Sequence, residues 1–263
     1  MEFTEFERRG WALRSGTYDS GFGAMTAALH PRLLDAVGAA AGTRLLEVGC
    51  GTGRLAALAH GRGAEVTATD AVPEMVAEAA VALPGVRVRE AALPGLPFPD
   101  GGFDAAVGAF VVNHVPDPPA AVADLHRVLA AGGRVALSCW DAPARNRAQG
   151  IFFDAVAETG AAGPGDLPSS SPFAPYATAE GLAGLLTAAG FTEVEVEPVT
   201  WTHRVDPQRW WQDVLSGTVL TSSLIESRPP AVVERIRAAY HRLAAAHPDG
   251  LPVAALLASG TRP

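Results

Sequence analysis

The sequence predicts an α/β protein built around a mainly parallel sheet. Between residues 43 and 140, short apolar runs alternate regularly with segments of helical spacing. Strands that are separated by helices form right-handed βαβ units, which place the strands parallel in one sheet. The chain has 263 residues and is 48% hydrophobic, so it can bury a sizeable core within one large domain.

The expected elements of this region follow one another closely. We expect strands at 43–49, 64–70, 86–91, 103–112 and 133–140, and helices at 54–60, 72–83 and 118–129. Pro73 stands near the start of the second helix, where proline is tolerated. Gly132 and Gly133 are expected to end the third helix, because glycine adopts the left-handed conformation of a helix C-cap.

The pattern loosens after residue 140. We expect a helix within 141–160, and then a Pro/Gly/Ser segment, 161–176, that is long enough to be a lid. A helix from Thr178 to Gly190, an alternating strand at 191–201, a helical stretch at 206–247 and a last strand at 251–260 complete the chain. The resulting single domain, 1–263, has four parts: a helical N-terminal arm (1–42), a core (43–140), a lid (141–178) and a helical insertion (206–250).

Composition excludes several classes of function. A formal charge of −8 argues against a nucleic-acid binder and favours a small-molecule partner. No run of 18 apolar residues and no apolar signal core are found, so we expect a cytoplasmic protein without a membrane span. Cys50 and Cys139 are expected to be reduced thiols, and no Cys/His cluster has zinc spacing, so no metal is expected. The composition and charge also allow a homodimer.

The stretch "LLEVGCGTG", residues 45–53, joins the first strand to the first helix through three glycines. Such a turn can be purely structural, or it can hold a dinucleotide, since Gly51, Gly53 and Ala56 satisfy G-x-G-x-x-A. Neither interpretation explains Glu47 or the first glycine, Gly49. S-adenosylmethionine explains both, because its methionine end is cationic and the glycines let the backbone approach it closely.

The end of the second strand supports the same cofactor. Asp70 stands there, 17 residues after Gly53. An acid at this position can accept both ribose hydroxyls as a bidentate pair, which a 2′-phosphate would hamper.

At this point the sequence resembles the class I S-adenosylmethionine-dependent methyltransferases, in particular the small-molecule group with the E/D-x-G-x-G-x-G signature. The resemblance rests on "LLEVGCGTG", "VTATDAVPEMV", "LPGLPFPDGGFDAAVGAFVVNHVPDP" and "LHRVLAAGGRVALSCW", which occur in the family's order between residues 43 and 140. It implies a Rossmann-like seven-stranded sheet of order 3-2-1-4-5-7-6 with strand 7 antiparallel, and a cofactor over the carboxyl ends of strands 1, 2 and 4.

The resemblance also implies the residues that contact the cofactor and the places of the two thiols. The cofactor contacts would be Tyr18, Glu47, Gly49, Cys50, Gly51, Gly53, Asp70, Ala71, Met75, Ala92, Leu93, Phe110 and Asn113. Cys50 and Cys139 would end strands 1 and 5 on either side of strand 4, about 10 Å apart, which is too far for a disulfide.

One position departs from the family pattern. The family usually has an Asp before "LPF" that holds the adenine amino group, and Ala92 stands in its place. Two alternatives follow. Either Glu90 takes over, since it would share a sheet face with residue 92 if the strand continued, or adenine is held by backbone groups near Leu93 and by apolar contact with Met75 and Ala71.

Methyl transfer to an oxygen or carbon acid needs a base near neutral pH. His114 follows strand 4 at the carboxyl edge of the sheet, and in similar enzymes a His here often faces the acceptor. We therefore expect His114 to be the catalytic base; the alternative is a His that only hydrogen-bonds a neighbouring loop. His203 is a second candidate.

Aromatic residues are concentrated outside the core region. In similar sequences a Tyr like Tyr18 folds over the methionine end of the cofactor, although simple packing of the arm, with Trp11, explains it equally well. Aromatic side chains at helical spacing are usually core, but in lid segments they can wall an apolar acceptor pocket. The expected pocket residues are Trp140, Phe152, Phe153, Tyr176, Trp210 and Trp211.

The sequence therefore predicts a methyltransferase that acts on a small, partly apolar metabolite through an oxygen or carbon acceptor and releases S-adenosyl-L-homocysteine. Its lysine-free composition resembles proteins of high-GC bacteria, where such enzymes often serve secondary metabolism. One alternative is a cyclase or isomerase on the same fold that keeps the cofactor without methyl transfer. Another is a non-catalytic partner subunit, against which the intact set from Glu47 to Asp70 argues.

Overall fold

A computed structural model describes residues 2–19, 21–160 and 171–263, so part of the predicted lid, 161–170, lies outside the described residues. The chain forms two compact units. The first consists of Met1–Met25, Trp140–Ser169 and Thr200–Ala255, and the second of Thr26–Cys139, Ser170–Val199 and Leu256–Pro263. Much of the predicted arm, lid and helical insertion thus belongs to the first unit. That the two act as one domain stays a prediction.

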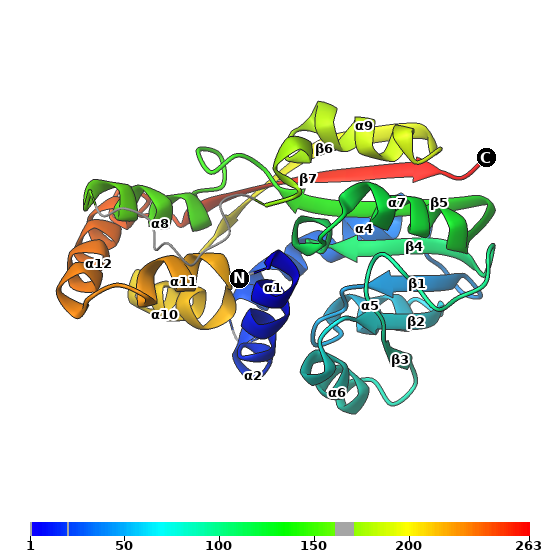
Figure 1. Cartoon of the computed structure of the whole chain (residues 1–263), viewed down its shortest axis with the longest axis horizontal. Helices are drawn as coiled ribbons and strands as arrows, with labels where there is room; N and C mark the ends of the chain where they lie inside the picture. The colour runs from blue at the N-terminus through cyan, green and yellow to red at the C-terminus, as the bar shows by residue number, and fades with distance from the viewer. Residues whose placement is uncertain (1, 20, 161–170) are drawn as a thin grey trace. The chain divides into compact units, whose positions relative to one another are not determined.

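The sheet has seven strands in the order β3-β2-β1-β4-β5-β7-β6, which confirms the predicted topology. The pairs β1–β2, β1–β4, β2–β3 and β4–β5 are parallel, and in Figure 1 the arrow of β7 points opposite to those of β4 and β5. The strands are β1 (Arg44–Val48), β2 (Glu65–Asp70), β3 (Arg87–Glu90), β4 (Phe103–Ala109), β5 (Leu129–Trp140), β6 (Thr192–His203) and β7 (Leu251–Thr261).

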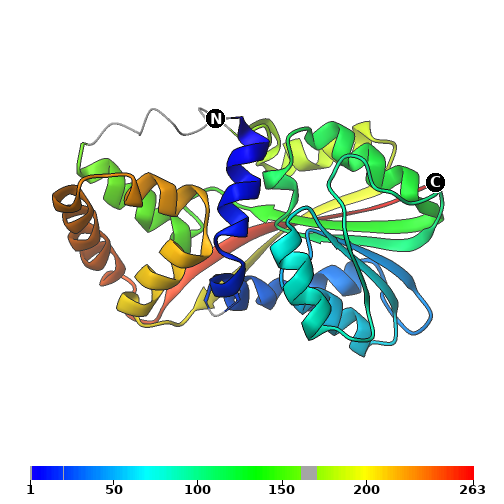
Figure 2. The same ribbon diagram turned by 60° about the horizontal axis from the view of Figure 1, so that its bottom comes forward.

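Helices cover both faces of the sheet in the second unit. Figure 2 shows α7 and α9 on one face and α4 on the other. The elements are η1 (Ala27–Leu29), α4 (His30–Ala36), α5 (Arg54–Gly61), α6 (Pro73–Ala82), η2 (Val112–His114), α7 (Pro118–Val128), η3 (Ala174–Tyr176) and α9 (Ala179–Ala188). As predicted, Pro73 opens α6 and Thr178 caps α9, whose Gly181 amide donates to the Thr178 hydroxyl at 3.0 Å.

The core of the second unit lies between the sheet and the pair α7–α9. Leu46 of β1, Leu137 of β5, Leu125 of α7 and Leu186 of α9 have no exposed surface. Because strands of a parallel sheet are buried on both faces, their sequences are nearly continuous apolar runs. This composition explains why the strands could be located from the sequence.

Two predicted boundaries were wrong. β4 ends at Ala109, not at residue 112, because Phe110 turns into the left-handed region at φ 56° and η2 follows. α7 ends at Val128, and the glycines expected to stop it lie inside β5 instead. Phe103 pairs with Leu129 but Ala105 with Arg134, so β5 carries extra residues there. Gly132 lies among these extra residues at φ 77°, and its amide donates to the Arg262 carbonyl at 2.8 Å.

The first unit is helical apart from the ends of β5, β6 and β7. Its helices are α1 (Phe3–Ala12), α2 (Ser15–Tyr18), α3 (Phe22–Thr26, which runs one residue into the second unit), α8 (Arg147–Glu158), α10 (Pro207–Gly217), α11 (Leu220–Glu226) and α12 (Pro230–Ala244). Among the described residues, no helix combines the length and apolarity that a membrane crossing requires.

Aromatic side chains form the core of this first unit. Phe152 stacks on Trp211 at 5.6 Å between ring centroids and contacts Tyr240 at 4.5 Å. Trp210 stacks on Phe22 at 5.9 Å, and its indole N–H donates to the Ala148 carbonyl at 2.9 Å. Packing alone therefore accounts for the burial of these rings.

Neighbouring residues of α8 allow a matched test of this core. Phe152 is 0% exposed, whereas Phe153 is only half-buried. We expect Phe152→Ala to lower the free energy of unfolding by about 3–5 kcal/mol, because it leaves a cavity among rings. Phe153→Ala should cost about 1–2 kcal/mol, because less apolar surface is lost. Urea denaturation of both variants checks this, and equal losses would contradict the assigned core.

Candidate active site

The turn after β1 has a backbone that only glycine adopts easily. Gly49, Gly51 and Gly53 have φ values of 65°, 52° and 92°. A Cβ on Gly49 would lie 2.4 Å from Cγ2 of Val111, and one on Gly53 would lie 2.5 Å from Cδ1 of Leu83. The dihedral angles and the close neighbours thus explain why glycines stand at these alternate positions. They also account for Gly49, the first glycine, which the dinucleotide motif does not include.

Asp70 links this turn to the loop after β2. Its Oδ2 accepts from the Gly51 amide at 2.8 Å and its Oδ1 from the Val72 amide at 3.0 Å. The side chain is 8% exposed. Burial raises the pKa of Asp70, while the amide hydrogen bonds and the charge of His114 oppose that rise. Each carboxylate oxygen has two lone pairs, so acceptance of the ribose hydroxyls is compatible with these bonds and stays a prediction.

Glu47 lies at the end of β1 and is 2% exposed. Its carboxylate accepts from the Ala56 amide, which is one of the unpaired N–H groups in the first turn of α5. Its Oε2 has no hydrogen-bond partner among the residues that the structure describes. Burial and the neighbouring Asp70 carboxylate raise the pKa of Glu47 well above its usual range, and the Ala56 bond only partly offsets this.

The capping of α5 by Glu47 was missed by the sequence reasoning. The usual signal is a Ser, Thr, Asp or Asn directly before a helix, whereas Glu47 precedes α5 by seven residues. The acid reaches the helix only because the glycine turn folds back over the strand. An acid that occurs shortly before such a turn is the signal that could have indicated the cap.

The two cysteines are both free and buried, as predicted. Burial raises the pKa of the Cys50 thiol, and the carboxylates of Glu47 and Asp70 raise it further. A thiol that stays protonated is a poor nucleophile. Cys50 is therefore not an activated nucleophile, and its contact with the cofactor stays a prediction.

The predicted adenine contacts fall into two groups. Met75 and Leu93 are buried, whereas Ala71, Glu90 and Ala92 are exposed. β3 ends at Glu90, which stands opposite Asp70, and the Ala91 amide donates to the Asp70 carbonyl at 2.9 Å. The strand does not continue to Ala92, so the condition under which Glu90 would share its face is not met.

The chain after β4 brings further predicted residues to the same edge. The amide of Phe110, at φ 56°, donates to the carbonyl and the hydroxyl of Ser138, both at 3.1 Å. Asn113 Nδ2 lies 2.7 Å from His114 Nε2, so the amide fixes the orientation of the imidazole. The charge of His114 also acts on Asp70. His114 therefore lies within electrostatic reach of the cofactor residues.

Most predicted pocket residues belong to the first unit. Phe152, Trp210 and Trp211 are buried in its aromatic core, while Trp140 and Phe153 are half-buried. The remaining one, Tyr176, lies in the second unit and packs against its core. The ring of Tyr18 contacts those of Trp11 and Phe22, at 5.6 and 6.2 Å between centroids. His203 contacts Trp210 in the first unit, at 4.5 Å.

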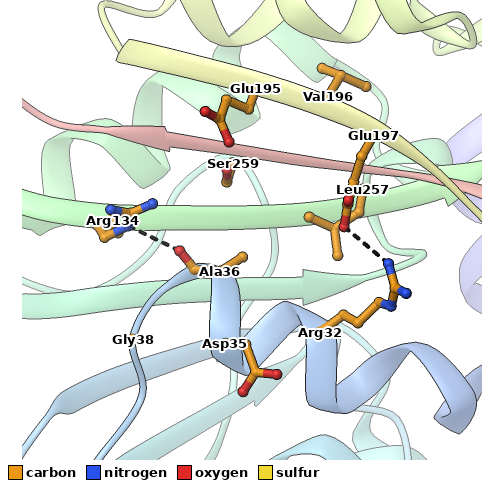
Figure 3. A pocket seen from close by; sticks show the side chains of 10 residues that line it. All are labelled: Arg32, Asp35, Ala36, Gly38, Arg134, Glu195, Val196, Glu197, Leu257 and Ser259. Carbon is orange, nitrogen blue, oxygen red and sulfur yellow. Dashed lines mark hydrogen bonds and ion pairs between the residues drawn. The ribbon is translucent and has the colours of Figure 1, made fainter.

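A cavity of about 620 Å³ in the second unit lies away from this edge. Figure 3 shows Arg134 bonded to the Ala36 carbonyl and Arg32 paired with Glu197 on its wall. Arg134 stands opposite Ala105 at the amino end of β4, whereas Phe110 and His114 follow the carboxyl end of that strand. The cavity is therefore not the place where a methyl group would be transferred. Its other lining residues are Asp35, Gly38, Glu195, Val196, Leu257 and Ser259.

The residues at the carboxyl edge fit S-adenosylmethionine. The buried Oε2 of Glu47 lacks a partner and suits the cationic methionine end of the cofactor. The glycine turn leaves no side chain in the way of close approach, and Asp70 supplies acceptors for ribose. Glu47 does not suit a pyrophosphate beside this turn, whereas Asp70 can serve the ribose of either cofactor.

Comparison with known proteins agrees with this geometry. The model of the family described as "Methyltransferase domain" matches residues 46–137. An uncharacterized protein of Mycobacterium tuberculosis is 34% identical over 200 residues, which cover 72% of this chain and 70% of the relative. The demethylmenaquinone methyltransferase of Thermus thermophilus is 44% identical over 98 residues, 35% of this chain and 44% of that protein.

Solved structures share the fold. The YcgJ protein of Bacillus subtilis aligns with a TM-score of 0.58 at 19% identity, over 89% of this chain and 98% of that one. The cyclase SpnF aligns with a TM-score of 0.53 at 23% identity, over 89% of this chain and 80% of that one. The fold and the glycine turn define a nucleotide-cofactor enzyme of the Rossmann-like type. More specifically, the chain belongs to the class I S-adenosylmethionine-dependent methyltransferases, with S-adenosylmethionine as its cofactor.

Asp70 provides a test of the cofactor site. We expect Asp70→Ala to weaken S-adenosylmethionine and S-adenosylhomocysteine alike, by about 1.5–3 kcal/mol, because charged hydrogen bonds are lost. Isothermal titration calorimetry measures both affinities. Glu74→Ala, at an exposed acid in the first turn of α6, is the control and should leave them unchanged. Tighter binding of NAD(H) than of S-adenosylhomocysteine would contradict the assigned cofactor.

Proposed function

We propose that this methyltransferase acts on a small, partly apolar metabolite, at an oxygen or carbon atom that loses a proton. The observation that supports this proposal is the placing of His114, which Asn113 orients at 2.7 Å and which lies within electrostatic reach of Asp70. An amine acceptor in its neutral form needs no base, whereas a hydroxyl or a carbon acid does. A positioned imidazole beside the cofactor residues therefore favours the latter two.

The chain's own residues would act by alignment and by proton transfer. The bound cofactor supplies the methyl group and a good leaving group. Backbone groups of the glycine turn and the carboxylates of Glu47 and Asp70 would fix its orientation, since in-line displacement depends on alignment. Neutral His114 would take the proton of the acceptor at Nδ1, with the Asn113 amide turned so that its oxygen accepts from the Nε2–H group and holds the ring in position.

The half-buried aromatic residues include the proposed contact of the apolar part of the acceptor. Trp140, Phe153 and Tyr176 keep exposed surface, whereas Phe152, Trp210 and Trp211 are committed to packing. An amphipathic ring can bury one side in the core and offer the other to a ligand. Tyr176 lies in the same unit as His114, and we propose it as a contact of the acceptor. A homodimer and a role in bacterial secondary metabolism are parts of the same proposal.

A cyclase or isomerase activity is the second candidate. The likeness to SpnF supports it only at the level of the fold, at 23% identity. Incubation with methyl-labelled cofactor and panels of phenols, enols and amines separates the two. Transfer of label to a phenol or an enol supports the proposal. Turnover of an acceptor without formation of S-adenosylhomocysteine would favour the cyclase.

Removal of the imidazole should affect turnover and not cofactor binding. We expect His114→Gln to lower kcat by about 10²–10⁴-fold, the usual contribution of a general base. Cofactor affinity should change little, because Glu47 and Asp70 remain. In the wild type, protonation of the imidazole should lower the rate at acidic pH. This loss of rate should be absent from the pH–rate profile of His114→Gln.

A matched variant shows whether this effect is specific. His60→Gln changes an exposed histidine of α5 and should leave kcat and its pH dependence unchanged. Turnover of His114→Gln within about threefold of wild type would show that alignment alone suffices, and that His114 only lines the site.

A further inference from the structure

Glu47 is an ionisable group of the site whose charged form is poorly stabilised by its surroundings. It is 2% exposed, and its Oε2 has no hydrogen-bond partner among the described residues. An isolated carboxylate in such a place is costly, and the group lowers that cost by keeping its proton. The Ala56 amide at the N-terminus of α5 stabilises the negative charge only in part.

The nearest charged group makes ionisation less favourable still. The Asp70 carboxylate lies on β2 beside β1 and acts on Glu47 through its charge. Asp70 accepts from the amides of Gly51 and Val72, and such bonds favour its ionised form. Of two carboxylates at one site, the one with more amide donors holds the charge and the other keeps the proton. In the cofactor-free site these contacts favour the protonated form of Glu47 over that of Asp70.

Among the described residues, no positive side chain is a cause of the pKa shift of Glu47. Burial raises the pKa of the Cys50 thiol and favours its neutral form. His114 acts on Asp70. On α5, Arg54 and His60 are exposed at the helix surface, while Glu65 and Asp104 stand at the amino ends of the neighbouring strands β2 and β4.

We propose that Glu47 is a charge selector: it is protonated in the empty site and ionises only when the cationic end of the cofactor lies beside it. The proton leaves the carboxyl group for solvent as the cofactor binds, and the resulting carboxylate pairs with the cofactor's ammonium. A nucleoside without an ammonium group cannot promote the release of this proton. It therefore binds beside Glu47 in its neutral form. This inference rests on the cofactor and not on the acceptor proposed above.

The proposal determines whether the affinity for the cofactor rises or falls with pH. Binding requires the ionised form of Glu47, which becomes more available as pH rises toward the raised pKa of the empty site. Affinity for the cofactor therefore increases with pH, by up to about tenfold per pH unit. The increase stops above that pKa, where the site is already ionised before binding.

Two ligands that differ in the amino-acid end, which carries the ammonium, provide the test. S-adenosylhomocysteine carries the ammonium, and 5′-methylthioadenosine shares its adenosine and thioether but lacks the amino-acid end. Calorimetry at pH 7 in phosphate and in Tris, two buffers of different ionisation enthalpy, counts the protons released. We expect a release of up to about one proton with S-adenosylhomocysteine, and none with 5′-methylthioadenosine.

Two variants complete the experiment. In Glu47→Gln the proton release and the rise of affinity with pH should both disappear. Glu65→Gln, at an exposed acid of β2, should keep both. If Glu47→Gln does not fold, the two ligands in the wild-type protein decide alone. Equal proton release with both ligands, or none with S-adenosylhomocysteine that binds, would overturn the proposal. Failure of S-adenosylhomocysteine to bind at all would overturn the cofactor assignment itself, and the proposal with it.

Discussion

The geometry of the site depends on the two hydrogen bonds that Asp70 accepts. They come from Gly51 in the turn after β1 and from Val72 in the loop after β2. One carboxylate thus fixes two loops that the parallel sheet delivers to the same edge. The left-handed glycines can adopt their turn because this acceptor satisfies an amide that would otherwise point at no partner. The acid that is predicted to bind the ribose thus also fixes the structure of the turn.

The burial of Glu47 follows from the same arrangement. The turn that Asp70 holds carries α5 back over the end of β1, so that the Ala56 amide reaches the Glu47 carboxylate. The site therefore contains two acids and the positive end of one helix dipole, and no positive side chain among the described residues is a cause of the pKa shift of Glu47. A cationic ligand corrects this imbalance and an anionic one worsens it. The charged residues at the turn indicate the chemistry of the cofactor more clearly than its glycines do.

Much of the fold could be predicted from the sequence because its signals are local. Apolar runs such as residues 45–48 mark strands that are buried on both faces, and Pro73 and Thr178 mark helix starts. The ends of β4 and α7 could not be predicted in this way. Phe110 at positive φ and the bulge at Gly132 depend on hydrogen bonds to Ser138 and Arg262, which the chain makes only once the sheet is assembled.

The residues of the candidate site also divide into those that local sequence signals indicate and those that only the folded chain defines. Glu47, Asp70 and the glycines could be found because the spacing along the chain reflects one strand, one turn and the next strand. The aromatic residues could not be sorted by their spacing, since Phe152 and Phe153 are adjacent and yet one is core and the other is partly exposed. Which face of a helix meets a core depends on its partners in space. For the same reason the cofactor could be inferred from the turn, whereas the acceptor depends on side chains whose exposed faces only the folded chain defines.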